Sequence, residues 1–88
     1  MSFYRTEVKE MKNIQREIDK AKERQMIIRS LCERAVAQYR NMCKFYNQSA
    51  YPLVWYDYKY VFENKSLREL RAIVRRNVIL DKLSSALI

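Results

Sequence analysis

The chain has 88 residues and a formal net charge of +8, with 18 Lys and Arg against 10 Asp and Glu. It contains no Gly, no His, one Pro and two Cys. Without Gly the chain cannot form a P-loop or a Rossmann phosphate turn, and without His it lacks the usual general base near pH 7 and the commonest metal ligand. These absences favour a protein that is not an enzyme and needs no metal or other cofactor.

A chain of this length is expected to form one domain, residues 1–88, and to bury only about 60–65% of its unfolded surface. No disulfide framework compensates for the small core, so we expect a homo-oligomer. The excess of positive charge favours anionic partners, which include nucleotides, nucleic acids and acidic protein surfaces.

Several features predict a cytoplasmic protein without a membrane contact, in the host cytoplasm if the source is viral. The longest stretch without a charged residue, Phe45–Tyr56, is too short and too polar to span a bilayer. The first residues lack the apolar core of a signal peptide. Cys32 and Cys43 would lie about 16 Å apart on one helix, beyond disulfide reach, and are expected to be buried thiols.

The first predicted element is a long helix over about residues 6–47. Apolar residues recur there at alternating spacings of three and four, the pattern of helices that pack at shallow angles. This heptad seam comprises Met11, Ile14, Ile18, Ala21, Gln25, Ile28, Cys32, Ala35, Tyr39, Met42 and Tyr46. Gln25 is its one strongly polar member, and it either sets the register of an oligomer or is partly solvated.

The middle of this helix is apolar on a second side as well. Met26 and Ile27 face away from the seam, and Leu31 and Val36 widen it. A helix that is apolar on two sides needs two partners. We expect one partner from the C-terminal half of the chain and the other from a second subunit.

A turn is expected over residues 47–52, because the polar residues from Asn47 onward end the seam and Pro52 prevents a smooth helical continuation. Pro52 is suited to the first turn of a new helix.

The short aromatic segment 53–63 is ambiguous. Its propensities are those of a strand, but no other part of the chain resembles a strand that could pair with it. We favour a short helix with Trp55, Tyr58 and Phe62 on one face, and a strand is the alternative.

The last predicted element is a helix over residues 67–86. Ser66 and Glu69 have the spacing of a capping box, which marks a helix start, and apolar residues follow at helical spacing. The predicted fold is all-α: the long N-terminal helix with its heptad seam packs against two shorter helices, in a homo-oligomeric helical assembly.

Basic residues form two stripes. The first follows one face of the long helix and contains Arg5, Lys9, Lys12, Arg16, Lys20 and Arg24, and the second, on the last helix, contains Arg68, Arg71 and Arg75. The second stripe has fewer acidic neighbours, and Arg can bind a phosphate group in a bidentate manner. Each stripe can instead be a solvated face that keeps the protein in solution.

The chain begins with Phe3 and Tyr4, directly before the basic long helix. An aromatic ring beside a cation can stack on a base while the cation contacts phosphate, or it can anchor the chain in a neighbouring subunit. In length, helix layout and this aromatic start, the chain resembles the small helical phage proteins that sequester cyclic-nucleotide signals in anti-CBASS immune evasion. That resemblance implies a non-enzymatic oligomer that binds a (cyclic) nucleotide at subunit interfaces, with Tyr4 and Lys20 as candidate contacts.

The candidate phosphate-binding residues are therefore Tyr4, Arg5, Lys9, Lys20, Arg71 and Arg75. Two other functions stay open. The basic stripes could follow a nucleic-acid backbone, or the protein could be a small viral inhibitor or adaptor that contacts another protein through Met26 and Ile27. A fainter resemblance, through Glu17-Ile18-Asp19, is to the helical chorismate mutases, whose fold needs no His.

Overall fold

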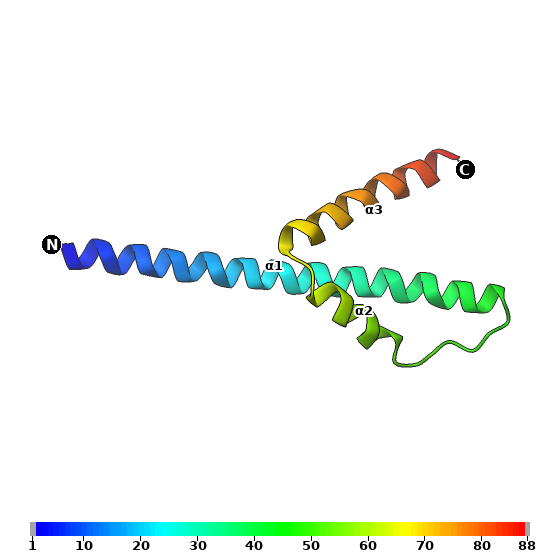
Figure 1. Cartoon of the computed structure of the whole chain (residues 1–88). Coiled ribbons are helices and arrows are strands. Elements are labelled where there is room, and N and C mark those ends of the chain that lie inside the picture. The colour runs from blue at the N-terminus through cyan, green and yellow to red at the C-terminus, as the bar shows by residue number, and fades with distance from the viewer. Residues whose placement is uncertain (1, 88) are drawn as a thin grey trace.

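The computed structural model describes the backbone of residues 2–87 and the side chains of residues 7–87. It contains three helices, α1 (Ser2–Phe45), α2 (Val54–Glu63) and α3 (Leu67–Leu87), and no strand within the described residues. In Figure 1, α1 is one continuous rod, α2 runs back beside its middle, and α3 leaves that middle region and diverges. The all-α prediction and the packing of a long first helix on two shorter ones are confirmed.

The end of α1 has a C-terminal cap that usually contains glycine. Asn47 has a φ of 55°, in the left-handed region. The N–H of Gln48 donates to the Cys43 carbonyl at 2.8 Å, and the N–H of Asn47 donates to the Lys44 carbonyl at 3.2 Å. These two bonds form a Schellman motif. Asn is the residue other than Gly that tolerates this conformation best, so the chain stops α1 without a glycine.

The aromatic segment is a helix, so the strand alternative is wrong. Pro52 lies in the preceding turn, and α2 begins two residues later, at Val54. The N–H of Tyr51 donates to the Tyr39 hydroxyl at 3.0 Å, which ties this turn back to α1. Trp55, Tyr58 and Phe62 lie on one face of α2, as predicted.

The start of α3 contains one of the two hydrogen bonds that define the predicted capping box. The Glu69 N–H donates to the Ser66 side-chain oxygen at 3.2 Å. The Leu70 N–H donates to the Ser66 carbonyl at 3.0 Å. The reciprocal bond, from the Ser66 N–H to the Glu69 carboxylate, is not among the hydrogen bonds of the described residues.

The core lies where the middle of α1 meets both shorter helices. Its buried members are Ile28, Leu31, Cys32 and Leu70, and the partly buried residues packed against them are Ile27, Trp55, Tyr58, Phe62, Ile73 and Val74. The second apolar side of α1 is therefore partly covered from within the chain, because Ile27 packs here, while Met26 remains 72% exposed.

Cys32 and Cys43 are buried free thiols, and burial raises the pKa of the Cys32 thiol.

The seam is uncovered along the N-terminal half of α1. Met11, Ile14 and Ile18 are 68%, 60% and 42% exposed. The reason is length: α2 has 10 residues against 44 in α1, so it covers only the seam near Ile28 and Cys32. The molecule consequently measures 69 × 33 × 14 Å with a radius of gyration of 19.0 Å, against about 12 Å for a compact domain of this length.

Candidate functional site

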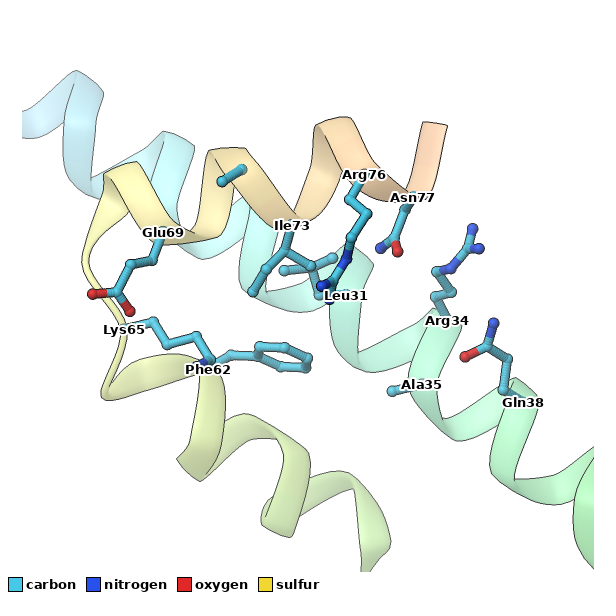
Figure 2. Close-up of a pocket in the computed structure, with 11 residues that line it drawn as sticks. Leu31, Arg34, Ala35, Gln38, Phe62, Lys65, Glu69, Ile73, Arg76 and Asn77 are labelled. Carbon is cyan, nitrogen blue, oxygen red and sulfur yellow. The ribbon is translucent and has the colours of Figure 1, made fainter. Parts of the chain in front are cut away.

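A wedge-shaped cavity opens where α3 diverges from α1 (Figure 2). Its volume is about 540 Å³. The residues that line it are Leu31, Arg34, Ala35, Gln38, Phe62, Lys65, Glu69, Ala72, Ile73, Arg76 and Asn77. They come from α1, the end of α2, the linker and α3, so the divergence of the helices creates this site. We call it the wedge cavity.

Positive charge dominates the wedge cavity, since three of its four charged side chains are cationic. Figure 2 shows Arg76 directed from α3 toward α1 and Arg34 directed from α1 toward α3. Lys65 and the single acid, Glu69, lie at the end near the linker. Within the described residues, Lys65 and Arg76 make no ion pair, which leaves both cations available to an anionic ligand.

The remaining lining offers apolar contact and hydrogen bonds. Leu31 and Ile73 form an apolar floor, and the Phe62 ring lies beside them in Figure 2. The Gln38 and Asn77 amides each carry both donor and acceptor groups. The cavity therefore combines cations, one aromatic ring and two amides in a single space.

Two bidentate ion pairs clamp α3 onto α1, and their α1 partners, Glu23 and Arg34, lie on either side of the core residues Ile28 to Cys32. Arg71 binds the Glu23 carboxylate with N–O distances of 3.0 and 2.7 Å. Arg34 binds the Asp81 carboxylate at 2.7 and 2.8 Å. The hydrogen bonds from these guanidinium groups lower the pKa of Glu23 and the pKa of Asp81. The second clamp lies at the mouth of the wedge cavity, because Arg34 also lines the cavity.

The clamps make the stability of the protein depend on pH. A carboxylate with a lowered pKa in the folded state stabilises the fold above its unfolded pKa, and this contribution disappears as pH falls through the folded value. Starting from ordinary pKa values of 4.5 for Glu23 and 3.8 for Asp81, we expect the urea midpoint to be constant at neutral pH and to fall below about pH 4.

The matched control for this pH dependence is the double variant E23Q/D81N, which removes both titrating carboxylates and retains their shapes. Its urea midpoint should be lower than that of the original chain at pH 7 and should change less between pH 7 and pH 2. Equal pH dependence in the two proteins would show that the clamps do not contribute to it.

The structure describes four of the six predicted site residues, and it does not bring these four together. Tyr4 and Arg5 lie outside the residues whose side chains are described. Lys9 and Lys20 are exposed on α1, eleven residues apart, which is about 16 Å along a helix. Arg71 is bound to Glu23, and Arg75 is exposed on α3. No common pocket joins the four described members of the set.

The sequence analysis missed the residues of the wedge cavity. Arg34, Lys65 and Arg76 are separated in the sequence and belong to no single stripe. Only the packing of α3 against α1 brings them to the lining of one cavity. Arg76 does sit directly beside the predicted Arg75, and this adjacency is the one signal that the sequence offered.

Comparison of the chain with models of protein families, with curated proteins and with solved structures finds no match. Within the described residues, none of the helices has the length and apolar character required to cross a bilayer. The same part of the chain holds no cluster of side chains that could ligate a metal ion. The functional argument therefore depends on the geometry of the wedge cavity.

Proposed function

We propose that this protein is a non-enzymatic helical binding protein that captures a phosphorylated ligand, specifically a nucleotide, in the wedge cavity. The observation that carries this proposal is the convergence of Lys65 and Arg76 with the Phe62 ring and two amides on one space. Cations bind phosphate oxygens, and Arg does so through a planar fork of donors. An aromatic ring stacks on a base, and amides pair with its edge.

The size of the cavity supports a nucleotide as the ligand. Its volume of about 540 Å³ is within the range of about 300–1,000 Å³ that small-molecule sites occupy. A free phosphate ion would fill only part of this volume and would not use Phe62 or Asn77. A cyclic nucleotide is the ligand to test first, since the resemblance to the phage sequestering proteins implies one.

The test is a calorimetric titration of the full chain with a cyclic dinucleotide, with AMP and with inorganic phosphate. We expect at least one of the nucleotides to saturate the protein and phosphate alone to bind more weakly. Because a hydrogen bond to a charged group contributes about 1.5–3 kcal/mol, R76A should weaken nucleotide binding by about 10- to 150-fold.

The matched control is R75A, which removes the neighbouring Arg and lies outside the cavity lining. Its affinity should stay within about twofold of the original chain, since an exposed charge at this distance contributes little. An unchanged affinity in R76A, or an equal loss in both variants, would refute a specific site in the wedge cavity. Failure of every nucleotide to bind would also refute the proposal.

A second candidate function is binding to a nucleic-acid backbone. It is favoured by one observation: Arg68, Arg75 and Lys82 recur at a spacing of seven along α3 and are exposed. Residues seven apart share a helix face, so these cations could follow a row of phosphates. Duplex DNA belongs in the same titration. Binding that weakens steeply with salt, and that weakens more in R75A than in R76A, would support this second function.

A further inference from the structure

The chain carries two exposed apolar surfaces that none of its own described residues covers. The first is on α1, in the segment that we call the arm (residues 7–22), where Met11, Ile14, Ile18 and Ala21 share a face and are exposed. The second, which we call the α3 stripe, consists of Ile79, Leu80, Leu83 and Leu87, and these residues are 58%, 47%, 56% and 88% exposed. Both surfaces have the three-and-four spacing of helix contacts.

The exposed area of the chain is large enough to accommodate an extensive interface. The chain exposes 8064 Å², whereas a compact protein of this mass exposes about 5,500 Å². A standard interface buries about 800 Å² on each partner. The excess of about 2,500 Å² is therefore enough for an interface of the larger, obligate class.

We propose that a second copy of this chain covers both surfaces, with the arm of each copy packed on the α3 stripe of the other. The lengths match. Met11 to Ala21 spans about 15 Å and Ile79 to Leu87 about 12 Å on a helix. In Figure 1, α1 and α3 run in the same general direction, away from the N-terminal end. If a two-fold axis makes the α1 helices of the two copies antiparallel, each arm is also antiparallel to α3 of the other copy. The same symmetry then forms both contacts between an arm and an α3 stripe.

The charges beside the two surfaces are compatible with the contact. In the antiparallel alignment that sets Met11 against Leu87, Glu17 lies level with Asp81 of the second copy. Each of these two carboxylates already has a cationic partner in its own chain, Lys20 for Glu17 and Arg34 for Asp81. The basic stripe of the arm, which includes Lys12 and Arg16, lies on the opposite side of the helix from the seam and so stays in solvent. The arm carries five basic and four acidic residues, so it brings little net charge to the contact.

Pairing of one arm with the other arm is the competing arrangement, and it is less favourable. An antiparallel arm pair centred between Ile14 and Ile18 places the two Glu17 carboxylates beside the two-fold axis, where like charges repel. It also leaves the α3 stripe of both copies in solvent. The reciprocal arrangement makes two contacts in place of one and covers all four surfaces.

The position of the α3 stripe links the second copy to the wedge cavity. The row Ile73, Arg76, Leu80, Leu83 and Leu87 continues along one side of α3 at spacings of three and four. The first two members line the cavity, and the last three belong to the stripe. The incoming arm would therefore lie at the open end of the wedge cavity.

The proposal is tested first by cross-linking. This experiment needs no ligand, so its outcome does not depend on whether the protein binds a nucleotide. Variants I14C and L83C are prepared separately, mixed and mildly oxidised. We expect a disulfide-linked dimer in the mixture and no dimer from I14C alone. The original chain, with both cysteines buried, is the control and should stay uncross-linked. A dimer from I14C alone would establish the arm–arm arrangement, and no dimer in any sample would refute both.

Sedimentation equilibrium provides the second test. The original chain should sediment as a dimer or a multiple of one, and I18D should raise the dissociation constant by at least about 100-fold, because two buried apolar contacts per dimer are lost. The control K12Q changes the charge by the same amount on the opposite face and should leave the dissociation constant unchanged. Helix content by circular dichroism confirms folding, since Ile18 is not in the core. A monomeric original chain, or equal effects of I18D and K12Q, would overturn the proposal.

Discussion

The variant L70A is expected to lower the free energy of unfolding by about 2–5 kcal/mol, the range for deletion of a buried leucine side chain. Leu70 is 0% exposed and is the one buried core residue that α3 contributes. Its methyl groups pack against Ile28, Leu31 and Cys32, so the truncation leaves a cavity where α3 meets α1. Total stabilities are only about 5–15 kcal/mol, so L70A is expected to leave α3 largely detached at physiological temperature.

Urea unfolding followed by circular dichroism measures this loss. The matched control is M26A, which deletes a side chain of similar size that is 72% exposed on the same part of the molecule. Its free energy of unfolding should stay within about 0.5 kcal/mol of the original value. A loss of similar size in both variants would contradict the position of the core.

The variant S30P is expected to lower the free energy of unfolding by about 3 kcal/mol or more. Ser30 is exposed on α1, between the core residues Ile28 and Leu31. Proline at this position removes the hydrogen bond to the Met26 carbonyl and clashes with that carbonyl, so it bends the helix. Because α2 and α3 both pack on this part of α1, a bend there separates the two halves of the core.

The matched control is S30A, which keeps the backbone N–H and improves helix propensity by a few tenths of a kcal/mol. Thermal unfolding should show a lower midpoint and a lower helix content for S30P, and an unchanged or slightly higher midpoint for S30A. A stable S30P variant would mean that α1 is not continuous through the core.

The helices could be predicted from local patterns, because each depends on residues close in the sequence. The seam, without an interrupting Gly or Pro, predicted a helix over about 6–47, and α1 spans Ser2–Phe45. The polar residues from Asn47 onward predicted its end, and Ser66 predicted the start of α3. The ambiguous segment became a helix because Trp55, Tyr58 and Phe62 can all reach α1 from one helical face.

The extent of burial could not be predicted in the same way. Spacing shows which residues share a face, but it does not show what covers that face. Ile14 and Ile28 have equivalent places in the seam, yet Ile14 is 60% exposed and Ile28 is 7% exposed. The difference depends on where α2 ends, which is a property of the tertiary structure.

The wedge cavity was unpredictable for a related reason. Stripes of like charge can be read from the sequence, and they directed attention to Arg71 and Arg75. In the structure the Arg71 guanidinium group forms an ion pair with the Glu23 carboxylate, 48 positions away in the sequence. Arg34, Lys65 and Arg76 line one cavity only because α3 leaves α1 at an angle. A pattern along one helix carries no information about such a meeting of three segments.

The glycine-free cap at Asn47 has a consequence for the entropy of folding. Glycine loses more backbone freedom on folding than any other residue. This chain contains no glycine, so it does not bear that entropic cost. Among the described residues, Asn47 alone adopts a positive φ. Fewer conformations are open to the unfolded chain, so less entropy opposes folding. This smaller entropic cost favours folding around a core with few fully buried side chains.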